Sequence, residues 1–401
     1  MLIRLFMAVV LLLGVSGTLP AALRVDTSFP GGSATVTSLD VRGRILRIKP
    51  AEPADRGWPC WWFVRVDGTE PGVSFSLEVH GMNFALPDRA AVSADNAAWT
   101  QTGPGQTIPG GKVYGVVPAG ASVWLAWGPP FQWKDARTLV ATLSEKHADV
   151  DAFELCRSRE GRAVPALRFR PTEATALGEI RTVWIQARQH AWECGSSWVA
   201  KGFAEWMASP QAREFRRGTE VVIVPIMDLD NVERGAGGKD QKPHDHNRDW
   251  SDRPHWPEVA AAQAHLRRWD AAGLETVFID LHNPGPNDRV PFFFTAPEAT
   301  VSPVRRLEQS RFLEAARIGM GKGPLAFTGM LRSTGPDYHP LWERISSVWV
   351  SRHMTHPGVS LCLETSWNTP ESRVAGYEHV GASLGRTLEL YERGKVVGAA
   401  P

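Results

Sequence analysis

The chain has 401 residues, with 44 Lys and Arg against 43 Asp and Glu, and a formal net charge of +1. This length supports a large hydrophobic core without disulfides or structural metals, and the balanced charge argues against a basic nucleic-acid-binding protein. The composition includes 17 Trp but only 4 Tyr. Because a buried indole N–H requires a partner, so many Trp residues indicate large packing surfaces or the walls of a substrate site.

Residues 1–22 have the pattern of a secretory signal peptide. Arg4 precedes an unbroken apolar run over residues 5–13, and small residues with Pro20 follow. An apolar run this short does not reach the roughly 20 residues that span a bilayer. The pattern predicts export to the periplasm or secretion. The uncharged stretch up to Leu23 leaves an uncleaved N-terminal anchor open as the alternative.

The cysteines are scattered, at positions 60, 156, 194 and 362, and form no CxxC pair. This spacing argues against a disulfide framework and against a thiolate zinc site. Export would permit disulfides, but the sequence does not identify the pairs.

Residues 23–130 consist of short apolar or alternating runs separated by turn residues. Examples are residues 61–66, 73–79 and 122–127. Alternation with a period of two, broken by Gly and Pro, predicts an antiparallel β-sandwich.

The pattern changes after Pro129 and Pro130, and residues 131–397 form a second predicted domain. Residues 134–147 have helical spacing, and longer helical patterns then alternate with buried strand-like runs. This alternation predicts an α/β domain with helices on both faces of a largely parallel sheet. The expected strands are residues 182–187, 220–224, 276–281 and 359–363.

Two of these strands are followed by residues that can bind a metal. His190 and Glu193 come after the strand 182–187, and His282 directly follows the strand 276–281, with Asp280 two positions earlier on the same strand face. Two imidazoles and a carboxylate leave a fourth position open, as in catalytic zinc sites, and an outer carboxylate often holds a ligand imidazole. Each pattern alone also fits an exposed polar pair or a capping histidine. The same His/acid spacing recurs at His246/Asp249 and His255/Glu258.

Two further polar segments could bind substrate or move protons. Asn247 and Arg248 offer amide and guanidinium donors that suit a carboxylate, although a salt-bridged surface loop is the alternative. Glu364 directly follows the apolar strand 359–363, where burial would raise its pKa towards that of a general base. Cys362 lies on the same strand face and is interpreted as a packing residue.

This ordered series resembles the zinc carboxypeptidase family, and within it the branch of cytosolic carboxypeptidase-like enzymes. The resemblance extends over roughly residues 131–394, and residues 23–131 look like the β-sandwich that precedes the catalytic domain in that branch. The order of these segments along the chain, with 89 positions from Glu193 to His282, is more specific than any single motif. The matching segments are 158–162 (SREGR), 190–193 (HAWE), 195–203 (GSSWVAKGF), 225–232 (PIMDLDNV), 247–250 (NRDW), 280–282 (DLH) and Glu364.

The resemblance implies an α/β/α zinc carboxypeptidase domain with a central mixed, mostly parallel sheet, and one zinc ion per chain. His190, Glu193 and His282 would hold the zinc. Glu364 would be the general base. Asn247 and Arg248 would bind the terminal carboxylate of the substrate.

Two positions depart from the family's pattern. The second arginine of the family, which stabilises the oxyanion, is expected about nine residues before Asn247, where the sequence reads GAGGKD over residues 235–240. Lys239 could supply this charge, as a point donor rather than a fork. The substrate-side tyrosine has no clear counterpart, and Tyr338 is a better candidate for it than Tyr377.

The sequence therefore predicts a zinc metallocarboxypeptidase that hydrolyses C-terminal residues from peptides or proteins, without nucleic-acid partners and with no membrane contact beyond the possible anchor. The alternatives are a zinc amidase acting on N-acyl amino acids or cell-wall peptides, and a catalytically silent ligand-binding protein. Arg332, Arg344 and Arg352 are candidates for selecting an acidic terminal residue. Trp192, Trp250 and Trp367 are candidates for walls that exclude water around the metal.

Overall fold

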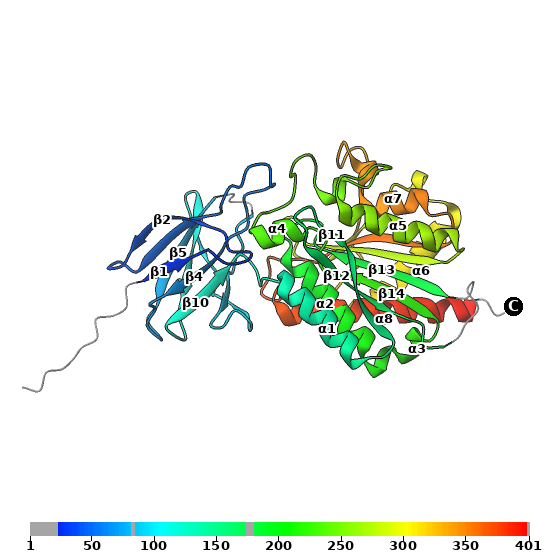
Figure 1. Cartoon of the computed structure of the whole chain (residues 1–401), viewed down its shortest axis with the longest axis horizontal. Coiled ribbons are helices and arrows are strands. Elements are labelled where there is room, and N and C mark those ends of the chain that lie inside the picture. Colours follow the sequence, from blue (N-terminus) through cyan, green and yellow to red (C-terminus); the bar gives the residue numbers. More distant parts are fainter. Residues whose placement is uncertain (1–22, 82–84, 174–179, 399–401) are drawn as a thin grey trace, which may run out of the picture.

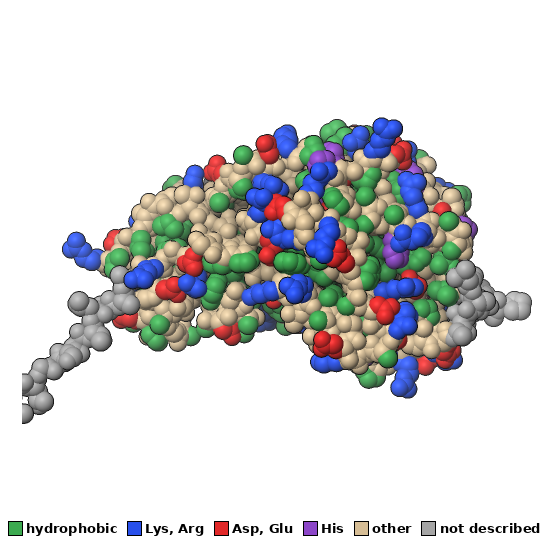
Figure 2. All heavy atoms as spheres, in the orientation of Figure 1, with side chains coloured by type: hydrophobic (Ala, Val, Ile, Leu, Met, Phe, Trp, Pro, Cys, Tyr) green, Lys and Arg blue, Asp and Glu red, His purple; other side chains and the backbone are tan. Residues whose placement is uncertain are grey.

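The computed structural model describes residues 23–81, 85–173 and 180–398. The predicted signal peptide, residues 1–22, lies outside the described residues. Within the described part of the chain, no helix is long and apolar enough to cross a membrane. Figure 1 shows a β-rich N-terminal region beside a larger α/β region. In Figure 2, basic and acidic side chains are interspersed over the visible face, as the net charge of +1 suggests.

The N-terminal region contains two five-stranded sheets, in the orders β1-β4-β10-β6-β7 and β2-β3-β5-β9-β8. The neighbouring strands are antiparallel, as the alternating pattern predicts, except that β3 and β5 run parallel. The strands are β1 (Arg24–Asp26), β2 (Thr35–Asp40), β3 (Ile45–Lys49), β4 (Phe63–Asp67), β5 (Phe75–His80), β6 (Ala91–Ser93), β7 (Thr100–Gln101), β8 (Gln106–Ile108), β9 (Gly111–Val116) and β10 (Ser122–Ala126).

The C-terminal region is built on an eight-stranded sheet in the order β11-β12-β14-β13-β15-β18-β16-β17. The centre of this mixed sheet, from β14 through β13 and β15 to β18, is parallel. The strands are β11 (Val150–Arg157), β12 (Ala163–Phe169), β13 (Arg181–Ala187), β14 (Thr219–Val224), β15 (Thr276–His282), β16 (Phe292–Thr295), β17 (Leu331–Ser333) and β18 (Gly358–Glu364).

Helices cover both faces of this sheet, as the α/β pattern predicts. Figure 1 shows α1, α2 and α8 on one face and α5 and α7 on the other. The α-helices are α1 (Trp133–Lys146), α2 (Cys194–Ala208), α3 (Arg213–Arg216), α4 (Leu229–Arg234), α5 (Pro257–Ala271), α6 (Pro303–Gly319), α7 (Ser346–His353) and α8 (Val374–Gly398). Short 3₁₀ helices are η3 (Pro210–Ala212), η4 (His246–Arg248), η5 (Glu298–Thr300) and η6 (Trp342–Arg344).

The hydrophobic core of the sandwich continues into the α/β domain. Trp192 and Trp367 of the α/β domain belong to the same buried cluster as the sandwich residues. The ring of Trp127 lies 5.1 Å from that of Trp192 and 4.5 Å from that of Trp367. Buried aromatic pairs of this kind contribute about 0.5–1.5 kcal/mol each beyond their apolar area. The two regions are therefore joined by packed aromatic side chains close to the predicted metal ligands.

Candidate metal centre and active site

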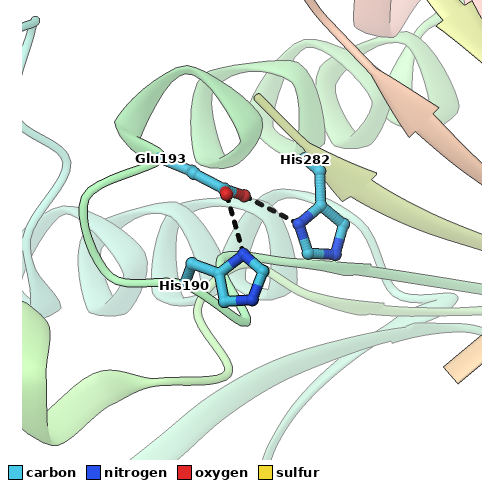
Figure 3. Close-up of side chains that lie close together, drawn as sticks. All are labelled: His190, Glu193 and His282. Carbon is cyan, nitrogen blue, oxygen red and sulfur yellow. Dashed lines mark hydrogen bonds and ion pairs between the residues drawn. The ribbon is translucent and has the colours of Figure 1, made fainter. Parts of the chain in front are cut away.

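The three predicted metal ligands meet at the carboxyl ends of two neighbouring parallel strands. The chain leaves β13 at Ala187, and the following loop carries His190 and Glu193 to the start of α2. His282 is the last residue of β15, which pairs with β13. Figure 3 shows the three side chains pointing towards one another. Because parallel strands end at the same edge of a sheet, the residues that follow them converge there.

The distances within this group fit a metal site. His190 Nδ1 lies 2.7 Å from Glu193 Oε1, and His282 Nδ1 lies 2.7 Å from Glu193 Oε2. The three ligand atoms lie within 4.8 Å of one another, and the residues are only 2–3% exposed. Two imidazole nitrogens and a carboxylate oxygen are the donor set of catalytic zinc sites.

A carboxylate lies near the outer nitrogen of each imidazole, and the one beside His282 is within hydrogen-bond distance. Asp280 Oδ2 lies 3.0 Å from His282 Nε2, as the sequence predicts, and Asp245 Oδ1 lies 3.5 Å from His190 Nε2. Each ring thus turns its Nδ1 towards the centre and its Nε2 towards an acid, the usual outer arrangement of zinc ligands. Although burial alone would raise it, the imidazoles of His190 and His282 hold the pKa of Glu193 well below its usual range. The residues present therefore fit a zinc ion.

Glu364 lies beside this triad as the last residue of β18. It is the register partner of His282 across the β15–β18 pair and is 8% exposed. Burial raises the pKa of Glu364 to about 7. Its Oε1 lies 3.7 Å from the sulfur of Cys362, and its Oε2 has no hydrogen-bond partner among the described residues. A buried carboxylate with one free oxygen and this pKa suits proton transfer near neutral pH.

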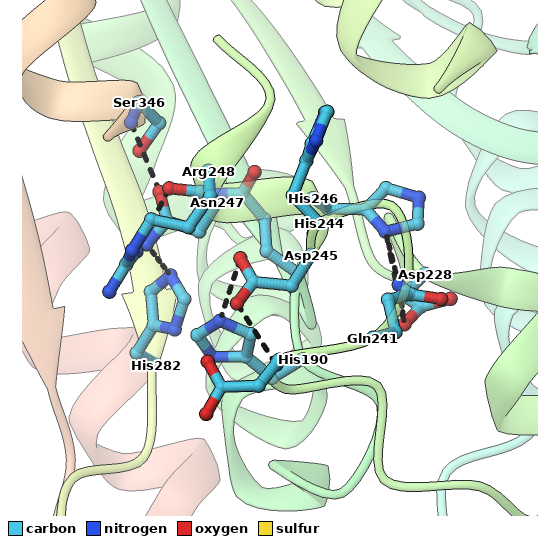
Figure 4. A network of polar contacts seen from close by, with 12 residues as sticks. His190, Asp228, Gln241, His244, Asp245, His246, Asn247, Arg248, His282 and Ser346 are labelled. Atoms are coloured by element: carbon cyan, nitrogen blue, oxygen red, sulfur yellow. Dashed lines mark hydrogen bonds and ion pairs between the residues drawn. The ribbon is translucent and has the colours of Figure 1, made fainter. Parts of the chain in front are cut away.

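A buried polar network holds the turn that carries Asn247 and Arg248 (Figure 4). Gln241 Nε2 donates to Asp228 Oδ2 at 3.1 Å and lies 3.2 Å from His246 Nδ1. Further along the turn, Asn247 Oδ1 accepts a hydrogen bond from the backbone N–H of Ser346 at 3.0 Å. These contacts fix the turn in place.

The positions of Arg248 and Tyr338 are compatible with their predicted roles at the substrate's carboxyl end. Arg248 Nη1 donates to the backbone oxygen of Asn247 at 2.9 Å, and its Nε has no partner among the described residues. The guanidinium carbon lies 5.9 Å from the centroid of the Tyr338 ring. A planar guanidinium with unused donors suits a bidentate carboxylate.

The predicted metal ligands, Glu364 and the predicted substrate-binding residues line one cavity of about 290 Å³. Lys239 lines it too. Apolar and aromatic side chains supply much of the remaining wall, which includes Trp58 and Ala85 of the sandwich. The predicted site residues that line the cavity are His190, Glu193, Lys239, Asn247, Arg248, His282, Tyr338 and Glu364.

One of the three tryptophans predicted as walls around the metal lies elsewhere. Trp192 and Trp367 line the cavity, but Trp250 does not: it is buried against Phe278 and donates its indole N–H to Gln189. The weaker tyrosine candidate, Tyr377, is a core residue with 1% exposure.

Two of the three arginines proposed as selectors of an acidic terminal residue lie outside the cavity. Arg344 and Arg352 do not line it, and Arg352 pairs with Glu343. Arg332 lines the cavity, but both arms of its guanidinium bind Asp288. Its charge is therefore already neutralised by a carboxylate of the same wall.

Sequence reasoning missed two contributors to the site. Asp245, the partner of His190, is separated from it by 55 positions, and no motif marks it. Trp58 was assigned to the sandwich, yet it lines the cavity. Its flanking Gly57 and Pro59 are a turn signal, but nothing in the sequence indicates what that turn contacts.

Comparison with known families identifies the domain. Residues 137–272 match the model of the zinc carboxypeptidase family. The chain carries a zinc carboxypeptidase domain. This domain makes the protein a hydrolase, and the family's cofactor is one zinc ion, for which the buried triad is the candidate site. The prediction of the family from the sequence is confirmed.

Relatives in sequence and structure agree with the zinc carboxypeptidase domain. An uncharacterized protein of Zymomonas mobilis is 24% identical over 285 residues, which cover 68% of this chain and 70% of that protein. Cytosolic carboxypeptidase 1 of Danio rerio is 29% identical over 142 residues, 32% of this chain and 12% of that protein.

Solved structures show that the fold is shared beyond the zinc carboxypeptidase domain. The metallo-carboxypeptidase of Burkholderia cenocepacia has a TM-score of 0.76 at 19% identity, covering 93% of this chain and 99% of that chain. The metallo-carboxypeptidase of Pseudomonas aeruginosa, in complex with (2-guanidinoethylmercapto)succinic acid, has a TM-score of 0.73 at 20% identity, covering 91% of this chain and 98% of that chain. The predicted fold, a β-sandwich followed by an α/β domain with a mixed sheet, is confirmed.

Proposed function

We propose that the protein is a zinc metallocarboxypeptidase that removes C-terminal residues from peptides or proteins. The observation that carries this proposal is the convergence in one cavity of the His190–Glu193–His282 triad, the carboxylate of Glu364 and the guanidinium of Arg248. An acid–base group, a metal site and an anion-binding group are the parts that hydrolysis of a terminal peptide bond requires.

When bound, zinc supplies Lewis acidity, which makes water a nucleophile at neutral pH. Glu364 accepts the proton from the attacking water at its free Oε2 and passes it to the nitrogen of the leaving amine. The water oxygen first bonds to the carbonyl carbon, which gives a tetrahedral intermediate, and the C–N bond then breaks as the leaving nitrogen takes the proton from Glu364. Lys239 stabilises the negative charge that develops on the carbonyl oxygen, as a point donor on the cavity wall.

Arg248 and Asn247 restrict the reaction to the chain end. A terminal carboxylate satisfies the unused donors of Arg248, whereas an internal peptide bond leaves them buried and unpaired. The (2-guanidinoethylmercapto)succinic acid in the Pseudomonas aeruginosa structure carries carboxylates, which is compatible with such an anion-binding group. Exopeptidase behaviour is therefore the expected consequence of this pair.

A substrate panel tests the proposal. Purified protein loaded with zinc is incubated with peptides that differ in the C-terminal residue, their C-terminally amidated forms, N-acyl amino acids and cell-wall peptides, and products are identified by mass spectrometry. We expect release of single C-terminal residues from free but not amidated peptides. Turnover of only the N-acyl amino acids or cell-wall peptides would replace the proposal with a zinc amidase. Binding without turnover would indicate a catalytically silent protein.

Export is a separate part of the proposal and rests on residues 1–22. N-terminal sequencing of protein recovered from the cell envelope or medium tests it. We expect a mature chain that begins near residue 23. Recovery of the full-length chain only from the cytoplasm would contradict export.

A further inference from the structure

A short segment of the sandwich is tied to the loop that carries Lys239. Residues 55–58, called here the strap, make three main-chain hydrogen bonds with residues 238–242. Trp58 N–H donates to Lys239 O, Gly238 N–H to Arg56 O, and Lys242 N–H to Asp55 O, each at 2.9 Å. Two segments about 180 positions apart in the sequence thus pair along their backbones.

Glycines allow this close approach. Gly57 has a φ of +84°, and a Cβ there would lie 2.2 Å from the backbone oxygen of Lys239. A Cβ at Gly237 would lie 2.1 Å from the backbone oxygen of Trp58. Only glycine fits such contacts without displacing a backbone. The Gly-rich stretch before Lys239 is therefore a docking surface for the strap.

The side chain of Trp58 fixes Lys239 from one side. The ammonium nitrogen of Lys239 lies 5.3 Å from the centroid of the Trp58 ring, and Trp58 Nε1 donates to Asp240 Oδ2 at 2.8 Å. Trp58 in turn stacks on Trp192 at 6.3 Å between ring centroids, with 23° between their planes. The indole is thus held by a neighbour on each side, and its face is presented to the cation.

The other side of the Lys239 loop is tied to the metal-ligand loop. Trp192 N–H, next to Glu193, donates to Gly237 O at 3.1 Å. Among the described residues, no carboxylate lies within ion-pair distance of the Lys239 ammonium. Of the other two cations that line the cavity, Arg332 is bound to Asp288 and Arg248 stacks on Tyr338. Arg332 is therefore neutralised, Arg248 keeps donors for the substrate's carboxylate, and Lys239 is left as a cation that this wall can offer to a developing negative charge.

We propose that Trp58 of the sandwich is a positioning residue for Lys239, so that the sandwich takes part in stabilising the transition state. This inference rests on the proposed function. Lysine is a flexible point donor, unlike the arginine fork that the family uses, and a cation–π contact restricts where its charge can sit. The aromatic face of Trp58 supplies the orientation that an arginine would have through its rigid guanidinium.

Variants at the two positions test the proposal on the full, zinc-loaded chain. Trp58→Phe keeps an aromatic face and Trp58→Leu keeps only apolar volume. Lys239→Ala is expected to lower kcat by about 100-fold or more with little change in KM, the usual effect of removing one oxyanion donor. Trp58→Leu is expected to lower kcat about tenfold and Trp58→Phe less than threefold, because only the former loses the cation–π contact. In a Lys239→Ala background, Trp58→Leu should have no further effect.

Binding of a phosphinic peptide, a mimic of the tetrahedral intermediate, provides a readout besides turnover. Lys239→Ala and Trp58→Leu should weaken its binding in proportion to their loss of kcat, while leaving binding of the free amino acid product unchanged. Trp99→Ala is the matched control, since Trp99 is a half-buried sandwich residue that does not line the cavity. Thermal unfolding midpoints of all variants establish that they are folded.

The outcomes separate this inference from the proposed function. Additive effects of Trp58→Leu and Lys239→Ala, or equal loss in Trp58→Phe and Trp58→Leu, would overturn the positioning role while the enzyme remains a carboxypeptidase. Wild-type protein with no turnover of C-terminal residues would overturn both proposals. If Trp58→Leu does not fold, Trp58→Phe decides the question. A folded Trp58→Phe with nearly full kcat, which Lys239→Ala then lowers as it does in the wild type, would support the aromatic contact.

Discussion

The metal triad and Lys239 line the same cavity but are held in different ways. His190, Glu193 and His282 lie at the ends of paired strands within one sheet, with outer carboxylates from the same domain. Lys239 lies on a loop whose backbone is paired with the sandwich. The triad is therefore a property of one domain, whereas the placement of Lys239, the proposed oxyanion donor, depends on the contact between two domains. We therefore expect substitutions in the triad to abolish zinc binding, and substitutions around Lys239 to lower kcat without loss of zinc.

Removing a triad ligand should have the largest effect. His282→Ala deletes one of three donors, so we expect loss of stoichiometric zinc and of detectable turnover. Metal content by mass spectrometry and release of C-terminal residues measure both. His80→Ala, a sandwich histidine beside Glu78, is the control and should change neither. Full zinc occupancy in His282→Ala would contradict the assignment of the triad.

Arg248→Ala should have the next largest effect and should spare the metal. Truncating one partner of a buried, hydrogen-bonded charge pair costs about 2–5 kcal/mol, so kcat/KM for free peptides should fall by at least about 30-fold. Discrimination against amidated peptides should disappear. The exposed Arg253 in the same loop region supplies a matched control, Arg253→Ala. Retained discrimination in Arg248→Ala would show that another group binds the carboxylate.

Replacing the outer carboxylate of Asp280 should have a smaller effect, and the effect should appear in the affinity for zinc. Asp280 Oδ2 lies 3.0 Å from His282 Nε2, and loss of such a partner typically weakens metal binding about 10- to 100-fold. Competition with a chelator should show this weaker zinc binding for Asp280→Asn. The zinc affinity of the control Asp252→Asn, at an exposed position, should equal that of the wild type. Equal affinities in the two variants would mean that the imidazole is oriented by other contacts.

The smallest effects are expected at the arginines outside the cavity. Arg344→Ala and Arg352→Ala should each change the preference between terminal Glu and terminal Leu by less than about twofold, because surface charges away from the substrate are screened. A library of peptides that differ only in the last residue measures the preference. A larger change for either variant would show that this arginine selects the terminal residue although it does not line the cavity.

The sequence predicted the triad because its signals are local. The buried strands were expected at residues 276–281 and 359–363, and each is extended by one residue at its carboxyl end, so His282 and Glu364 are strand residues rather than loop residues. Hydrophobic runs followed by polar residues mark the end of a parallel strand, and the sheet then brings those ends together. For this part of the site, local pattern and topology agree.

The remaining contacts could not be predicted because they join distant segments. The pairing of the strap with residues 238–242 depends on glycines that permit close approach. Neither segment has a sequence pattern that indicates which other segment it contacts. Trp250 was expected at the cavity from its position beside Asn247 and Arg248, but the turn directs its ring towards Phe278. Neighbours in sequence at a turn point in different directions, which a linear motif does not encode.

Metal content and turnover, measured together on the wild type and on Glu364→Gln, test the central claim most directly. The account predicts one zinc per chain in both proteins, and release of C-terminal residues that is lower by about 10²- to 10⁴-fold in the variant, because general acid–base catalysis contributes that much. A wild type without stoichiometric zinc, or a Glu364→Gln variant with full activity on C-terminal peptide substrates, would contradict it.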